Sequence, residues 1–197
     1  MARASGAGAP RAPDGVHPGL GHTIASMAGA QPPVPDAATP APRPAVVTAL
    51  QAAYGAPSQS GFGSAAFHQA LAPDAGLEQA ALAAYRHFVG DAWQRWGEAA
   101  WRAPWREVHH RDPGAPADIV AELRGISDPE AARSAPMILE AIEGAEAAVA
   151  ALAAAFDDPA VTELRVFNLG DGGAMSGIEV AARRTDATAV LLVFLMD

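Results

Sequence analysis

Apolar and polar residues alternate along the C-terminal part of the chain in a pattern that predicts three β-strands. The three segments cover about residues 161–168, 177–184 and 188–196, and two short turns connect them. In the second segment Val180 would face one side of a sheet and Glu179 the other. This alternation is typical of an antiparallel sheet that has one face in water.

The third of these segments breaks the alternation, because residues 190–196 are apolar on both faces. Such a strand is usually covered on both sides, whereas at the border of a three-stranded meander it would promote aggregation. We therefore expect a further strand or a partner beside it. One candidate within the chain is the segment from Trp105 to Asp112, which has the alternation of a short strand.

Apolar positions spaced by three and four residues predict helices before these strands. The expected helices cover about residues 44–54, 77–103, 119–124 and 136–156. Pro104 would end the second helix, and Pro136 would begin the last one. Residues 56–76 are expected to form a loop. The predicted fold class is α+β, with helices packed on one face of a C-terminal sheet of three or four antiparallel strands.

The first 43 residues differ from the rest in composition. Residues 1–43 are rich in alanine, proline and glycine and contain almost no large apolar side chains. A segment of this kind cannot bury enough apolar surface to offset the entropy lost on ordering, so we expect a disordered tail. The remaining residues, 44–197, have the length of one α+β domain.

The charge of the chain restricts its partners. The 197 residues carry a formal net charge of −9, and residues 1–60 contribute +1 from three arginines and two aspartates, which leaves −10 for the remainder. An acidic domain repels phosphate backbones, which argues against nucleic acid as a partner. No apolar stretch approaches the roughly 20 residues that span a membrane, and the first residues lack the apolar core of a signal peptide. We therefore expect a cytoplasmic protein that does not bind membranes.

Cysteine is absent, which excludes disulfides and thiolate metal sites. All 13 basic residues are arginine, which we interpret as the coding bias of a GC-rich bacterial genome. Nothing in the sequence indicates a cofactor.

The most polar cluster consists of Glu107, His109, His110 and Asp112, whose side chains are of the types that bind metals or act as general bases. Neighbouring histidines on a strand point to opposite faces, however, and the spacing matches no zinc motif. We expect no metal and interpret these side chains as solvated or locally hydrogen-bonded. The alternative is a small hydrolase that uses these four residues, with or without a metal.

A second candidate is the glycine-rich stretch 170–177, which begins Gly170-Asp171-Gly172-Gly173. Backbone N–H groups of such turns can hold an anion, but the lysine and the helix that follow a phosphate-binding loop are absent. We expect a tight connection between two strands in which Gly172 supplies a positive φ. The alternative is a small-molecule or anion sensor that uses this loop.

Four tryptophans lie between residues 93 and 105, and they indicate either an aromatic core or a surface that binds a partner. Together with the doubly apolar last strand, they lead us to expect a non-catalytic accessory protein that acts through a protein–protein interface, as a homodimer or with another protein. A partner strand would pair beside residues 190–196. The expected binding residues are Trp93, Trp101, Trp105, Asp171, Gly172, Leu191, Val193 and Leu195.

Overall fold

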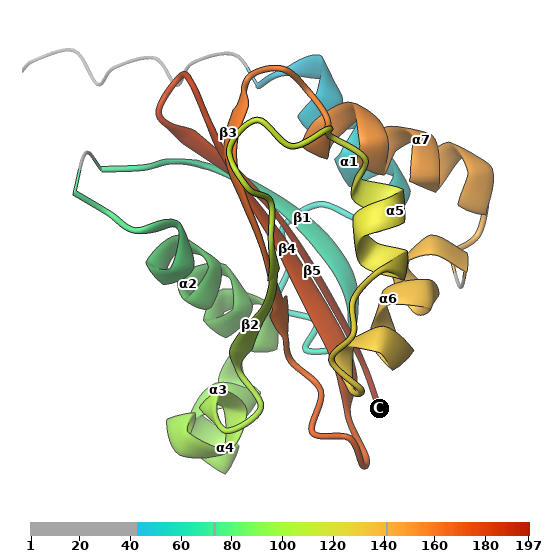
Figure 1. Cartoon of the computed structure of the whole chain (residues 1–197). Helices are drawn as coiled ribbons and strands as arrows, with labels where there is room; N and C mark the ends of the chain where they lie inside the picture. The colour runs from blue at the N-terminus through green and yellow to red at the C-terminus, as the bar shows by residue number, and fades with distance from the viewer. Residues whose placement is uncertain (1–42, 73, 141) are drawn as a thin grey trace, which may run out of the picture. The chain divides into compact units, whose positions relative to one another are not determined.

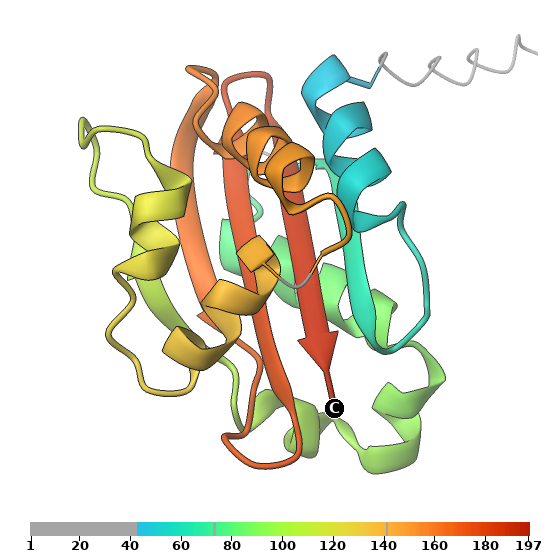
Figure 2. The ribbon, with the colours of Figure 1, turned by 90° about the vertical axis from the view of Figure 1, so that its right-hand side faces the viewer.

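The computed structural model describes residues 43–72, 74–140 and 142–197. Their centre is a five-stranded antiparallel sheet in the order β1-β5-β4-β3-β2, with a layer of helices on each face (Figures 1 and 2). The strands are β1 (Gly63–Ala70), β2 (Arg106–His110), β3 (Val161–Asn168), β4 (Ser176–Arg184) and β5 (Thr188–Met196). The predicted tail, residues 1–43, lies outside the described residues except for Arg43.

Seven helices belong to the described part of the chain. On one face lie α1 (Ala45–Tyr54), α5 (Ile119–Arg124), α6 (Ala131–Glu140) and α7 (Ala145–Phe156); on the other lie α2 (Leu77–Val89), α3 (Asp91–Trp96) and α4 (Glu98–Arg102). None of the helices described has the length and apolar content needed to cross a membrane.

The predicted α+β class with an antiparallel sheet is confirmed, and two details of the prediction are corrected. The sheet has five strands where three or four were expected, and helices cover both of its faces where one was expected. The reason lies in β5, whose residues 189–195 are at most 2% exposed. A strand that is apolar on both sides requires a layer on each side.

Two separate cores result from this arrangement. Leu192 of β5 belongs to the core beneath α1, α5, α6 and α7, together with Leu152 and Phe156. Its neighbours Leu191 and Val193 belong to the opposite core, beneath α2, α3 and α4. Successive side chains of a strand point to opposite faces, so β5 supplies both cores.

The partner of the apolar last strand is found within the chain. β5 lies between β4 and β1, and Ala66 of β1 pairs with Leu192. The sequence predicted a loop where β1 lies, because this strand is made mostly of small and polar residues. The strand predicted at 105–112 is confirmed as β2, but it pairs with β3 and not with β5. β5 therefore has no free edge at which a partner strand can add.

Two predicted helices, at 77–103 and 136–156, are each divided into shorter helices, and the second begins before Pro136. The helix expected at 77–103 becomes α2, α3 and α4, because Gly90 and Gly97 adopt positive φ angles of 62° and 85°. α6 begins at Ala131 and runs through Pro136, since the side chain of Asp128 accepts hydrogen bonds from the first backbone N–H groups. α7 then begins after Gly144.

Candidate functional site

Aromatic side chains from α2, α3 and α4 form a continuous stack at one end of the second core. The rings of Trp96 and Trp101 are nearly parallel, with centroids 5.0 Å apart, and Trp93 stacks on Trp101 at 6.3 Å. The indole N–H of Trp101 donates to the carbonyl of Ala92 at 3.0 Å, which ties α4 to α3. The breaks at Gly90 and Gly97 allow tryptophans from two short helices to face the same side.

The stack continues from the helices to the sheet through Tyr85 of α2. The rings of Trp93 and Trp101 each meet the ring of Tyr85 in an edge-to-face contact, with centroids 5.4 and 6.1 Å apart. Trp105 lies between Tyr85, at 5.7 Å, and Phe167 of β3, at 4.6 Å. The aromatic path therefore runs from the surface at Trp96 to the middle of the sheet.

An open cavity of about 190 Å³ lies at the surface end of this path. Figure 1 shows α3 and α4 at the same end of the sheet as the loop that joins β3 to β4. The cavity is lined by Phe62, Trp96, Ala100, Trp101, Asp171, Ala174, Met175 and Asp197. Phe62 is 37% exposed and Trp96 is 57% exposed, and among the described residues these are the two large hydrophobic side chains left exposed. Both line this one cavity.

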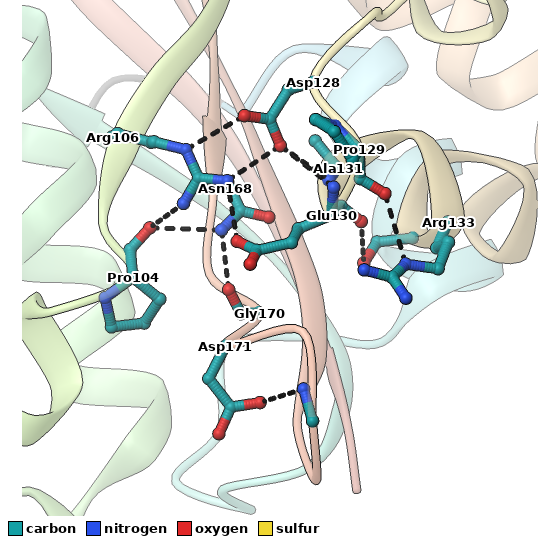
Figure 3. Close-up of polar contacts among 12 residues, drawn as sticks. Pro104, Arg106, Asp128, Pro129, Glu130, Ala131, Arg133, Asn168, Gly170 and Asp171 are labelled. Carbon is teal, nitrogen blue, oxygen red and sulfur yellow. Dashed lines mark hydrogen bonds and ion pairs between the residues drawn. The ribbon is translucent and has the colours of Figure 1, made fainter.

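A carboxylate at the rim of this cavity is held in place by its own loop. Asp171 Oδ1 accepts hydrogen bonds from the backbone N–H groups of Gly173 and Met175, each at 2.9 Å. Figure 3 shows one of these two bonds. These bonds lower the pKa of Asp171 below its usual 3.8. The cavity therefore combines exposed aromatic faces with an ionised carboxylate.

The loop is anchored from behind by a polar cluster. The guanidinium of Arg106 donates to both oxygens of Asp128, at 3.0 and 2.8 Å, and to Glu130 at 2.6 Å (Figure 3). The amide of Asn168 donates to the carbonyls of Pro104 and Gly170, at 3.1 and 2.7 Å. These contacts join the segment after α4, the loop between β3 and β4 and the start of α6.

The glycine-rich loop makes the tight connection that the sequence predicted. Gly172 has a φ of 74°, and a Cβ there would lie 2.7 Å from an oxygen of Glu130. The N–H groups of Gly173 and Met175 already bind Asp171, and the carboxylate of Glu130 lies beside the loop. Neither feature favours an anion at this place.

Of the four polar residues predicted at 107–112, the structure places Glu107, His110 and Asp112 next to one another, whereas His109 contacts a different element. His109 interacts with Glu122 of α5 at 3.2 Å. His110 is half exposed and lies 3.7 Å from Glu107 and 3.6 Å from Asp112. Among the described residues no three His, Cys, Asp or Glu side chains are arranged to hold a metal ion. The hydrolase alternative therefore gains no support from the geometry.

The other predicted binding residues divide into two groups. Trp93, Trp101 and Trp105 lie in the aromatic stack, and Asp171 lines the cavity. The three leucine and valine residues of β5 are fully buried beneath the stack, and Gly172 lines a separate polar cavity of about 230 Å³. The predicted tryptophans and the predicted loop residue Asp171 thus lie at one place, and the predicted residues of β5 form the core below it.

Glu179 is the residue that the sequence assigned to the wrong environment. The alternation in β4 placed its side chain in water, but α2, α3 and α4 cover this face and Glu179 is 0% exposed. Neither carboxyl oxygen has a hydrogen-bond partner, and the same is true of the Tyr85 hydroxyl and the Trp93 indole N–H. Burial raises the pKa of Glu179 well above the usual 4.5. In the sequence, only the apolar run of β5 indicated that both faces of the sheet are covered.

Comparison with protein-family models, with curated proteins and with solved structures finds no match to this chain.

Proposed function

We propose that this is a non-catalytic binding protein that takes up a cationic side chain of a partner protein in the aromatic cavity. The observation that carries the proposal is that Phe62 and Trp96, the exposed large hydrophobic residues of the described chain, line the same cavity. Exposed aromatic residues are enriched in protein interfaces and contribute much of their binding energy.

The charge of the site favours a basic partner. The face of an indole ring attracts an ammonium or guanidinium group, and carboxylates nearby add to this attraction. Asp171 and Asp197 supply carboxylates at the rim of the cavity. A second copy of this chain would bring the same acidic rim and a net charge of −9 to the contact, so the charge disfavours a homodimer through this surface.

The size of the cavity favours a single side chain over a larger ligand. Its volume of about 190 Å³ is below the roughly 300–1,000 Å³ of sites for drug-sized molecules. A lysine or arginine side chain from a protein segment fits such a volume, and the rest of the segment would lie across Trp96. A free small amine would occupy the same cavity. The same assay therefore also tests the alternative of a small-molecule sensor that uses the 170–177 loop.

The test uses short apolar peptides with one central residue varied, titrated against the tryptophan fluorescence of the protein. Peptides centred on lysine or arginine should bind, and peptides centred on glutamate should not. Trp96→Ala should weaken binding roughly 5- to 30-fold, which corresponds to about 1–2 kcal/mol. Benzylammonium, added alone, would raise the melting temperature if the natural ligand is a small amine.

A pair of matched variants checks the electrostatic part. Asp171→Asn removes a carboxylate at the cavity, and Asp186→Asn removes one at the other end of β4. Both side chains accept hydrogen bonds from nearby backbone N–H groups. Binding should fall in the first variant and be unchanged in the second. Equal effects in the two, or equal binding of cationic and anionic peptides, would show that the cavity does not select by charge.

A further inference from the structure

The carboxylates at the rim of the aromatic cavity have no counter-charge in the described part of the chain. Asp171 and Asp197 line the cavity, and neither forms an ion pair with a residue that the structure describes. Behind the loop, by contrast, Asp128 and Glu130 share the guanidinium of Arg106. The cavity thus combines exposed aromatic rings with two carboxylates that lack a cationic partner, and both features attract a cation.

The chain itself contains a segment of the complementary chemistry before α1. Arg11 lies between Pro10 and Pro13, which are three residues apart. A polyproline II helix has three residues per turn, so two prolines with this spacing would lie on one edge of it. Grooves lined by aromatic side chains bind proline-rich segments of this spacing. Residues 10–13 therefore offer both a cation and the proline rings that an aromatic cavity accepts.

The other basic and proline-rich positions in residues 1–43 suit the cavity less well. Arg3 has no proline beside it. Pro32 and Pro35 repeat the spacing of three, but an aspartate follows them and no arginine lies next to them. The guanidinium of Arg43 already donates a hydrogen bond to a side chain of α1 at 2.7 Å. Residues 10–13 are thus the best match.

The length of chain before α1 is sufficient to bring this segment to the cavity. Figure 1 shows that α1 begins at one end of the sheet and that α3 and α4 lie at the other end. The sheet is about 30 Å long, because its nine-residue strand β5 rises about 3.3 Å per residue. Arg11 lies 33 positions before Pro44, and a chain of this length spans up to roughly 110 Å when it is extended. The connecting chain is therefore long enough to follow the surface of the domain from one end to the other.

We propose that residues 10–13 of the chain's own N-terminal segment occupy the aromatic cavity, with the guanidinium of Arg11 on the face of Trp96. The inference rests on the proposed function and adds its regulation, because a basic partner must displace this segment to bind. The charges favour the contact, since residues 1–60 carry +1 and the rest of the chain carries −10. A contact within one chain also avoids bringing a second acidic copy to the cavity.

The contact is weak enough for a partner to displace it. A cation on an exposed aromatic ring changes an affinity by roughly two- to fivefold. Because Arg11 and the cavity belong to one chain, the occupancy of the cavity does not depend on protein concentration, and an added cationic peptide competes with Arg11. Removal of Arg11 should therefore strengthen the binding of the peptide by about the same factor.

The experiment titrates a lysine-centred peptide against the full chain and its Arg11→Ala variant and follows tryptophan fluorescence. Arg11→Ala should bind the peptide roughly two- to fivefold more tightly than the wild type, because the competing cation is gone. Arg3→Ala removes an arginine from the same N-terminal segment and should leave the affinity unchanged. In a Trp96→Ala background, Arg11→Ala should have no effect, since the ring that Arg11 contacts is absent.

A second measurement needs no added ligand. Acrylamide quenches the fluorescence of exposed tryptophans, and Trp96, which is 57% exposed in the described part of the chain, is the one that the segment would cover. Quenching should increase in the double variant Pro10→Ala/Pro13→Ala. The double variant Pro32→Ala/Pro35→Ala makes the same substitutions at the same spacing and should be quenched like the wild type.

The outcomes separate the two proposals. Equal peptide binding by the wild type and Arg11→Ala, with equal quenching in the proline variants, would overturn the inference while the cavity remains a cation site. An equal effect of Arg3→Ala would mean attraction by charge alone and would also overturn it. An effect of Arg11→Ala that grows with protein concentration would place the segment of a second copy in the cavity and overturn the contact within one chain. Failure of both proteins to bind any cationic peptide would overturn the proposed function itself.

Discussion

The burial of the Glu179 carboxyl leads to a specific prediction about how the stability of the protein depends on pH. The group is 0% exposed and has no hydrogen-bond partner, and burial raises its pKa in the folded state well above 4.5. At pH values between 4.5 and the raised pKa the folded protein keeps a proton that the unfolded chain releases. The free energy of unfolding must therefore fall as the pH rises through this interval.

The size of the effect follows from the linkage between proton binding and folding. One pKa unit corresponds to about 1.4 kcal/mol, so Glu179 reduces the free energy of unfolding by about 1.4 kcal/mol for each pH unit in the interval. Glu179→Gln keeps the shape of the protonated acid and removes the titration. The stability of this variant relative to the wild type should increase by about 1.4 kcal/mol for each pH unit within that interval.

The assay is chemical denaturation of both proteins at a series of pH values, followed by circular dichroism. The difference between the two free energies of unfolding removes the contribution of all other titrating groups. Glu146→Gln on α7 provides the matched control, because it makes the same substitution at an exposed position. Parallel curves for Glu179→Gln and the wild type would refute the reasoning, because they would mean that Glu179 titrates alike in the folded and unfolded states.

Two further predictions concern stability. Gly172→Ala should lower the free energy of unfolding by about 1–2 kcal/mol, because a residue with a Cβ is strained at φ 74° and its Cβ would press on Glu130; Gly173→Ala is the control, and an equal loss in both would show that the φ angle is not the cause. Arg111→Met should cost about 3 kcal/mol by chemical denaturation, because the guanidinium is mostly buried and bonds two carboxylates and the carbonyl of Phe156; a loss below about 1 kcal/mol would contradict this reasoning.

The pattern of apolar and polar residues within each strand was sufficient to predict the bounds of β3, β4 and β5 within one or two residues. Strict alternation in the first two and an unbroken apolar run in the third leave little freedom in assigning these strands. β1 was missed because alanine, serine and glycine carry no alternation that distinguishes a strand from a loop. Its status depends on pairing with β5, which local sequence does not specify.

Part of the candidate site was predictable from local sequence. The density of tryptophans between residues 93 and 105 and the glycine-rich stretch around Asp171 each indicated a candidate binding site. The sequence did not single out Phe62 and Trp96 as binding residues, because one exposed aromatic residue indicates a binding site only when another lies beside it. Glu179 was assigned to water because alternation shows that a residue faces away from one core and does not show whether a second core exists there.

The position of β5 between β4 and β1 has a consequence for synthesis. Gly63 pairs with Leu195, so β1 leaves the ribosome about 130 residues before its partner. At roughly 5–20 residues per second this delay lasts about 7 to 26 s, during which α1 and β1 have no sheet to join. The two layers can close only after residues 188–196 have emerged, and a nascent chain stalled before that point should depend on chaperones to remain soluble.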